Sequence, residues 1–205
     1  MNNVILTDVD GVMLNWEYAF DIWMQKNKGY PKPLPGQPTY DISKRYCILP
    51  GKGKELIRQF NESAAIGFLP PLRDAVHYIR KLHEEQGYVF HVITSLSTDR
   101  SAGELRTMNL KKLFGETAIE RFVYLDTGAD KDEILEQYRD TECMWVEDKM
   151  ENAVAGLRFG LNSILMEHGY NMQDSPSPTG WVRAGVHAHF IPRVKGWKEI
   201  YEMVA

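Results

Sequence analysis

Short apolar runs alternate with longer segments of helical periodicity along most of this chain. The five apolar runs are Val4–Leu6, Tyr88–Ile93, Arg121–Leu125, Cys143–Val146 and Asn162–Met166. Between them, apolar residues recur at helical spacing, and several of these segments stop at Gly87, Gly115 or Gly160, as helices often do. Strands that alternate with helices favour a parallel sheet covered by crossover helices. We therefore expect an α/β fold with the order βαβαβαβαβ.

One region, between the first apolar run and the second, interrupts this alternation. Residues 16–29 have the pattern of a helix with Trp16, Phe20 and Trp23 along one stripe, and residues 52–63 resemble a second helix. A proline-rich connector, residues 30–38, lies between the two helices. We predict a small helical cap formed by residues 15–70, inserted into a core formed by residues 1–14 and 71–205. An insertion directly after the first strand lies over the carboxyl ends of the strands, where open α/β sheets bind ligands.

Composition narrows the class of protein. The 205 residues, 43% of them hydrophobic and 25% charged, are enough for one well-packed core with an elaboration. A net charge of -4 argues against binding to extended nucleic acid, and no apolar run approaches the roughly 20 residues that span a bilayer. The chain has only two cysteines, Cys47 and Cys143, and begins without a basic leader. We expect a cytoplasmic protein that does not bind membranes, and an exposed loop over residues 174–180.

Two aspartates follow the first apolar run in the segment VILTDVDGVML. Asp8 and Asp10 flank Val9, so in an extended backbone their side chains point to the same side. Two carboxylates so close resist joint ionisation unless a cation lies between them or one keeps a proton. The pair therefore indicates metal binding, proton transfer or both. The alternative is a turn in which Asp10 bonds the local backbone and Gly11 supplies an unusual φ angle.

Polar residues also follow later strands. Thr94 and Ser95 end the second apolar run, Glu147 and Asp148 end the fourth, and Lys131 precedes a helix between them. Hydroxyl and ammonium groups at one edge could bind an anion. Each residue also has a purely structural alternative: a turn for the hydroxyls, a helix cap for the acids, and a solvated charge for the lysine.

Taken together, this set of motifs resembles the haloacid dehalogenase superfamily of aspartate-dependent phosphotransferases. The matching residues stand in the order of that superfamily: Asp8 and Asp10 in DVDGV, Thr94 in VITS, Lys131 in ADKDE, and Glu147 and Asp148 in WVEDKMENA. Within the superfamily the chain is most similar to the 5'(3')-deoxyribonucleotidases. That likeness rests on the small helical cap, the Thr-Ser pair, the paired acids followed by a basic residue, and residues 67–82. The chain has Glu-Asp where these nucleotidases tend to have paired aspartates.

The resemblance implies a catalytic chemistry. Asp8 would attack a phosphate monoester to form an aspartyl-phosphate. Asp10 would protonate the leaving oxygen and later activate water. A Mg²⁺ ion would be held by Asp8, Asp148 and the backbone carbonyl of Asp10, with Glu147 behind them or as an outer contact.

Phosphate binding is the second role that the resemblance implies. Thr94 would donate to a phosphoryl oxygen and Lys131 would neutralise its charge. Ser95, Arg106 and Lys149 are the further residues that we expect to bind the substrate. Either Lys131 or Arg106, or both, would be the main phosphate-neutralising group.

We expect residues of the cap to determine which substrate binds. Trp16 lies where the deoxyribonucleotidases have an aromatic residue that faces the base. The alternative is that Trp16 packs in the core of the cap itself. Tyr46 is a weaker candidate for base stacking. We expect hydrolysis of a small phosphate monoester, a nucleoside monophosphate. The alternatives are a phosphatase of sugar phosphates or of nucleic-acid 3' or 5' termini, and a catalytically silent phosphate-binding scaffold. The sequence leaves open whether two chains form a homodimer.

Overall fold

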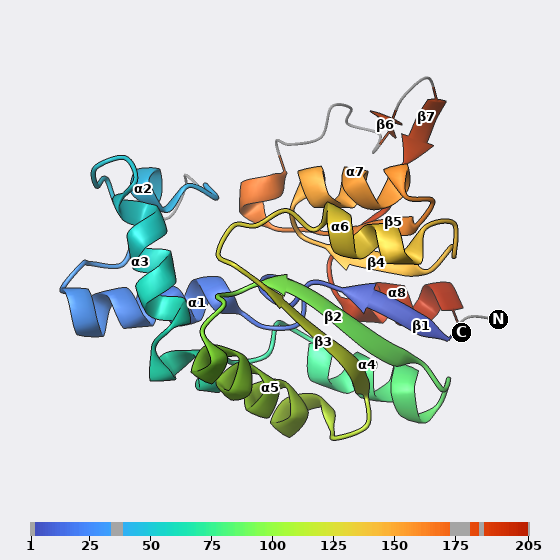
Figure 1. The fold of residues 1–205 in the computed structure, drawn as a ribbon, viewed down its shortest axis with the longest axis horizontal. Coiled ribbons are helices and arrows are strands. Elements are labelled where there is room, and N and C mark those ends of the chain that lie inside the picture. Colours follow the sequence, from blue (N-terminus) through green and yellow to red (C-terminus); the bar gives the residue numbers. More distant parts are fainter. Residues whose placement is uncertain (1–2, 34–38, 173–180, 185–186, 205) are drawn as a thin grey trace.

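A six-stranded parallel sheet forms the centre of the molecule (Figure 1). The computed structural model describes residues 3–33, 39–172, 181–184 and 187–204. The strand order is β3-β2-β1-β4-β5-β8, and every neighbouring pair is parallel. The strands are β1 (Val4–Thr7), β2 (Val89–Ser95), β3 (Ile119–Leu125), β4 (Met144–Glu147), β5 (Asn162–Met166) and β8 (Arg193–Val194). The predicted α/β fold and its five strands are confirmed; the short β8 was not predicted.

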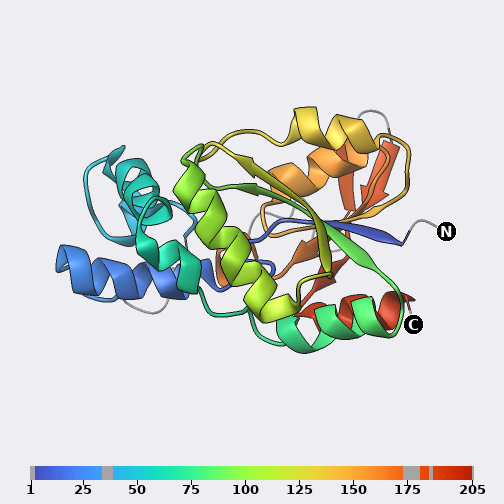
Figure 2. The ribbon, with the colours of Figure 1, turned by 60° about the horizontal axis from the view of Figure 1, so that its bottom comes forward.

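Helices cover both faces of this sheet. One face carries α4 (Ala75–Glu84), α5 (Arg100–Phe114) and α8 (Trp197–Val204), and the other carries α6 (Asp132–Leu135) and α7 (Met150–Arg158) (Figures 1 and 2). Successive residues of β1 point to opposite faces, so Ile5 packs in the first layer and Leu6 in the second. A 3-10 turn, Glu136–Tyr138, continues α6.

Local chemistry sets the ends of the core helices. The Asp99 carboxylate accepts a hydrogen bond from the Ala102 amide at 2.8 Å and so caps the first turn of α5. After α4 the chain turns at Gly87, whose φ of 73° is a conformation that side chains other than glycine rarely adopt. Gly115 and Gly160 follow α5 and α7 in the same way, as the sequence predicts.

A helical insertion follows β1 and projects beyond the carboxyl ends of the strands (Figure 1). It contains α1 (Trp16–Trp23), a π-helical turn (Met24–Lys28), α2 (Ile42–Arg45), α3 (Lys52–Asn61) and a 3-10 turn (Ala64–Phe68). Its two ends pair: Leu14 bridges Pro71, and the Asn15 amide donates to the Pro70 carbonyl at 2.9 Å. The cap is thus inserted where the sequence places it. The division at residues 15 and 70 into two structural units stays a prediction. Part of the proline-rich connector and residues 174–180 lie outside the described residues.

The cap has its own small core. Phe20 stacks on Trp16 with ring centroids 4.6 Å apart, and Phe60 from α3 meets both rings edge-on. Buried Asp21 accepts hydrogen bonds from the Tyr46 hydroxyl at 2.6 Å and from Arg45 at 2.7 Å. A buried carboxylate paired with a cation and a hydroxyl avoids the cost of isolated charge burial. Three helices too short to be stable alone are therefore held together by side chains.

The C-terminal segment returns to the loop after β1. After the antiparallel pair β6 (Trp181–Ala184) and β7 (His187–Phe190), the chain forms β8 and α8. The Asp74 carboxylate caps α8 by accepting from the Trp197 and Lys198 amides, and the buried Trp197 indole donates to the Val12 carbonyl at 2.8 Å. Within the part of the chain that the structure describes, no helix has the length and apolar character needed to cross a membrane.

Candidate active site

The candidate site lies at the carboxyl edge of the sheet, around the end of β1. This strand lies between β2 and β4, where the strand order changes direction, and such a switch point is where open α/β sheets bind ligands. Thr7 pairs with Val92 on one side and Val146 on the other, so Asp8 and Glu147 each follow directly after a paired residue of adjacent strands. The Asp8 amide donates to the Val146 carbonyl at 2.9 Å. The register of the sheet thus brings these two acids side by side.

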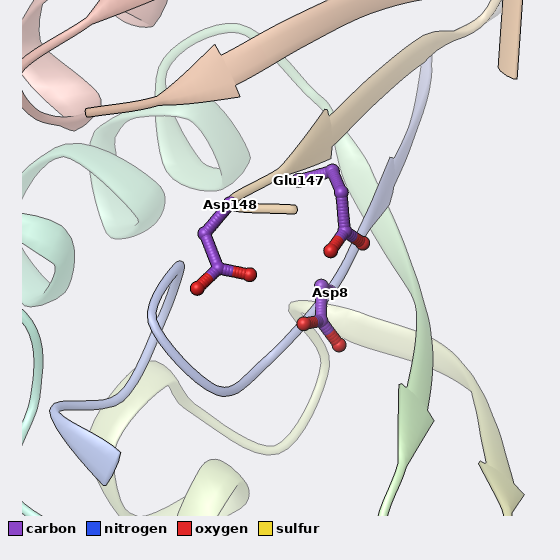
Figure 3. A group of neighbouring side chains, drawn as sticks. All are labelled: Asp8, Glu147 and Asp148. Carbon is purple, nitrogen blue, oxygen red and sulfur yellow. The ribbon is translucent and has the colours of Figure 1, made fainter. Parts of the chain in front are cut away.

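Three buried carboxylates gather here: Asp8, Glu147 and Asp148. Each offers an oxygen within 4.8 Å of the others, and Figure 3 shows the three groups around one space. Their side chains are almost inaccessible to solvent. Burial raises the pKa of Asp148, and the charges of Glu147 and Asp8 raise it further. Burial also raises the pKa of Glu147, although Lys131 opposes that change.

Lys131 is the cation nearest to these acids. Its Nζ lies 2.8 Å from Glu147 Oε2 and 2.9 Å from Asp8 Oδ1, and it is 2% exposed. Burial alone would lower the pKa of Lys131, but the Asp8 and Glu147 carboxylates outweigh it and raise the pKa, so the ammonium stays charged. The ammonium also lies over the Trp145 ring, 5.1 Å from its centroid. Lys131 thus lies beside Asp8, and its predicted role in neutralising a phosphate stays a prediction.

The donor set fits a divalent cation. Three buried carboxylates carry up to three negative charges, and Lys131 supplies one positive charge against them. Hard oxygen ligands of this kind suit Mg²⁺, which would also relieve the mutual repulsion that adds to burial in raising the pKa of Asp148. Asp8, Asp148 and Glu147 are the residues that would hold it. The Asp10 carboxylate is not part of this cluster. A role for the Asp10 backbone carbonyl in binding the metal stays a prediction.

Asp10 pairs with Arg106 from α5. The fully buried Arg106 guanidinium donates to Asp10 through Nη1 in a short contact to Oδ1 and through Nη2 to Oδ2 at 3.3 Å. Burial raises the pKa of Asp10, and Arg106 only partly offsets this. A raised pKa is what a carboxyl group needs in order to donate a proton. Arg106, predicted to bind phosphate, thus has the Asp10 carboxylate as its partner here; the phosphate-binding role stays a prediction.

The other predicted substrate-binding residues differ in their placement. Thr94 is 1% exposed at the carboxyl end of β2, two residues beyond the partner of Thr7. The Ser95 hydroxyl donates to the Ala129 carbonyl at 2.9 Å, which is a loop contact. Lys149 pairs with Glu151 at 2.9 Å. Thr94 therefore lies on β2, the strand next to β1, whereas Ser95 is bonded to a loop carbonyl and Lys149 is paired with Glu151. The roles of all three residues toward substrate stay predictions.

The two aromatic candidates in the cap are both tied to other side chains. Trp16 is half-buried, stacks on Phe20 and donates its indole N–H to Asn61 Oδ1 at 3.0 Å. The Tyr46 hydroxyl donates a hydrogen bond to the buried Asp21 carboxylate. The packing alternative for Trp16 thus has specific contacts, and base stacking stays a prediction.

Three residues that the sequence analysis missed follow β5: His168, Tyr170 and Asn171. His168 Nε2 lies 2.6 Å from the Gly11 carbonyl, and its ring stacks on Tyr170 at 4.8 Å. The Tyr170 hydroxyl donates to Asp148 Oδ2 in a short contact, and Asn171 Nδ2 donates to the Asp148 carbonyl at 2.7 Å. The sequence did carry a signal: polar residues follow the apolar run Asn162–Met166, as they follow the other strands that meet at this edge.

Solved structures with this architecture are similar over nearly the whole chain. A predicted phosphatase from Clostridium acetobutylicum matches with a TM-score of 0.63 at 11% identity, covering 100% of this chain and 98% of that one. A predicted phosphoglycolate phosphatase from Haemophilus somnus matches with a TM-score of 0.63 at 14% identity and the same coverage. A haloacid dehalogenase-like hydrolase from Streptococcus pneumoniae matches with a TM-score of 0.57 at 14% identity, covering 84% of this chain and 88% of that one. This chain has the haloacid dehalogenase-like fold. The fold of the resemblance is thereby confirmed, whereas the likeness to nucleotidases stays a prediction.

Sequence comparison adds one relative. The chain is 32% identical over 148 residues to an uncharacterized 32.4 kDa protein in the Gp30-rIII intergenic region of Enterobacteria phage T4. The alignment covers 68% of this chain and 51% of the phage protein, so the chain spans about half the length of the curated relative it matches. No family model matches the chain.

Proposed function

We propose that this protein is a magnesium-dependent phosphomonoester hydrolase that acts through an aspartyl-phosphate at Asp8. The observation that carries the proposal is the environment of the Asp8 carboxylate: an ammonium at 2.9 Å, and Glu147 and Asp148 close enough to share a cation with it. A carboxylate can attack a phosphate dianion only if nearby positive charge offsets their repulsion. Lys131 supplies part of that charge, and Mg²⁺, when bound, would supply the rest as a Lewis acid.

Asp8 and Asp10 divide the chemistry between them. An Asp8 oxygen attacks phosphorus, the bond to the ester oxygen breaks, and the leaving oxygen takes a proton from the Asp10 carboxyl group. Asp10, now a carboxylate, takes a proton from the water that attacks the aspartyl-phosphate. Inorganic phosphate leaves, and Asp8 and Asp10 return to their starting forms. The raised pKa of Asp10 supports this role, because it keeps a larger fraction of the carboxyl group protonated near neutral pH.

The proposed substrate is a nucleoside monophosphate. This choice rests on the resemblance to the deoxyribonucleotidases and on Trp16, which begins α1 directly after the loop that carries Asp8 and Asp10. Phe20 covers one face of the indole, so a base would have to stack on the other face. Sugar phosphates remain the alternative, since one structural neighbour is described as a D,D-heptose 1,7-bisphosphate phosphatase from Burkholderia thailandensis.

Two conservative variants test the proposal. Asp8→Asn removes the nucleophile, so turnover of p-nitrophenyl phosphate and of deoxynucleoside monophosphates should disappear. Asp10→Asn should lower turnover roughly 10²- to 10⁴-fold and allow the phosphorylated enzyme to accumulate, which intact-protein mass spectrometry would detect. Asp41→Asn is the matched control, because asparagine caps α2 as well as aspartate does. Wild-type activity in Asp8→Asn would show that Asp8 is not the nucleophile.

A further inference from the structure

Asp148 differs from Asp8 and Glu147 in the kind of side chain that contacts its carboxylate. Lys131 forms ion pairs with Asp8 and Glu147. Among the residues that the structure describes, no lysine, arginine or histidine lies within ion-pair distance of Asp148. Its side chain instead accepts a hydrogen bond at Oδ2 from the Tyr170 hydroxyl. A carboxylate has two oxygens, so one donor at Oδ2 restricts the rotation of the group and leaves Oδ1 for a cation.

The Tyr170 ring is itself fixed on two sides. It lies nearly parallel to the His168 ring, with centroids 4.8 Å apart and an interplanar angle of 4°. Tyr40 from the cap meets Tyr170 edge-on at 5.7 Å. The Tyr170 hydroxyl faces a carboxylate oxygen, which can only accept, so the hydroxyl is the donor of this hydrogen bond.

The segment after β5, which carries His168 and Tyr170, also contacts the loop after β1. His168 Nε2 contacts the Gly11 carbonyl at 2.6 Å, three residues beyond Asp8. Gly11 also makes room for the tyrosine: a Cβ at this position would collide with Asp148 Oδ2 and lie 2.8 Å from the Tyr170 hydroxyl oxygen. The absence of a side chain at Gly11 therefore permits the hydrogen bond. The segments that carry Asp8 and Asp148 are thus joined through His168 and Tyr170.

We propose that Tyr170 is the positioning residue of Asp148: its hydroxyl orients the Asp148 carboxylate toward Asp8 and Glu147, and so strengthens binding of a divalent cation by these three acids. This inference rests on the proposed function, because it takes the acidic cluster to be a Mg²⁺ site. Hydrogen-bond partners that orient metal ligands typically contribute 10- to 100-fold to metal affinity.

The test measures Mg²⁺ binding directly, without substrate. Calorimetric titration of the full chain with MgCl₂ should give a dissociation constant roughly 10- to 100-fold higher for Tyr170→Phe than for wild type. The phenylalanine ring keeps the stack on His168, so folding should be retained. Tyr201→Phe is the matched control, since it also removes a tyrosine-carboxylate hydrogen bond, at 3.0 Å to Glu85, and should leave the affinity unchanged.

Kinetics supply a second readout that a merely structural role would not give. In Tyr170→Phe the Mg²⁺ concentration for half-maximal turnover should rise, while kcat at saturating Mg²⁺ should return close to the wild-type value. Equal Mg²⁺ affinity in wild type and Tyr170→Phe would overturn the inference and leave the proposed function intact. Wild-type protein that binds no Mg²⁺ would instead overturn the proposed metal site, and the inference with it.

Discussion

His168 shows how burial can make one side chain sensitive to pH. The ring stacks on Tyr170, its Nε2 faces the Gly11 carbonyl, and burial lowers the pKa of His168 from 6.5 to about 4. The folded protein therefore resists protonation of His168 at pH values where the unfolded chain accepts a proton. The stabilisation is fully present above about pH 6.5 and is lost as the pH falls toward 4.

This pH dependence can be measured by a difference experiment. Between pH 7.5 and pH 5 the free energy of unfolding of wild type should fall by about 2 kcal/mol more than that of His168→Gln, whose side chain does not titrate. Urea unfolding at both pH values gives the four free energies required. The carboxylates of the site titrate in both proteins, so their contribution largely cancels in the difference. Parallel pH profiles would contradict the burial assigned to this histidine.

At the scale of elements, α3 connects the cap to the core beside the site. Buried Asn61 accepts from the Trp16 indole at 3.0 Å and donates to the Leu96 carbonyl, just beyond β2, at 2.8 Å. Ser97 and Glu62 bond at 2.8 Å in the same region. Trp16 is therefore fixed relative to β2, and any base that stacks on it would have a defined distance to Asp8.

Two substitutions of Trp16 separate stacking from packing. Trp16→Phe and Trp16→Leu both lose the bond to Asn61, but only phenylalanine keeps an aromatic face. If the ring stacks on a base, kcat/KM for deoxynucleoside monophosphates should be about tenfold lower in the leucine variant than in the phenylalanine variant, because stacking contributes about 1 to 3 kcal/mol. Turnover of p-nitrophenyl phosphate should be equal in both. An equal loss on both substrates would assign Trp16 to the cap's core.

At the scale of the whole molecule, the site joins segments from both ends of the chain. Asp8 follows β1, Lys131 and Asp148 come from the second half, and α8 contacts the Val12 carbonyl through Trp197. A ligand that binds only the folded site must therefore stabilise the whole chain.

Mg²⁺ with beryllium trifluoride, which mimics a phosphoryl group on an aspartate, tests this linkage. The pair should raise the melting temperature of wild type by several degrees, since binding at 100 times the dissociation constant contributes about 2.7 kcal/mol. Asp8→Asn should show no such rise, because it lacks the attacking carboxylate. Chelation of divalent cations should abolish both the rise and the phosphatase activity. Full activity after exhaustive chelation would contradict the metal-dependent chemistry.

Much of the fold and part of the site could be predicted from sequence because they depend on local patterns. The apolar runs and the intervening helical periodicity specify five strands and their crossover helices, and Asp8 and Asp148 occur directly after strands. Parallel strands bring their carboxyl ends to one edge, so residues that follow strands gather there without further information. The same rule applies to His168 and Tyr170 after β5, and it would have found them.

The partners of these residues depended on tertiary structure. The family resemblance singled out Arg106 for phosphate binding but did not predict its contact with Asp10, because only the packing of α5 against the sheet places the guanidinium there. In the sequence, Gly11 has only the features of a turn glycine. The structure shows that Asp148 and Tyr170 leave no space for a side chain at this position. Sequence periodicity determines which way a side chain points relative to its own element. The distance between side chains of different elements is set by how those elements pack together, so the sequence determined the fold and the acids, and the tertiary structure decided what each acid contacts.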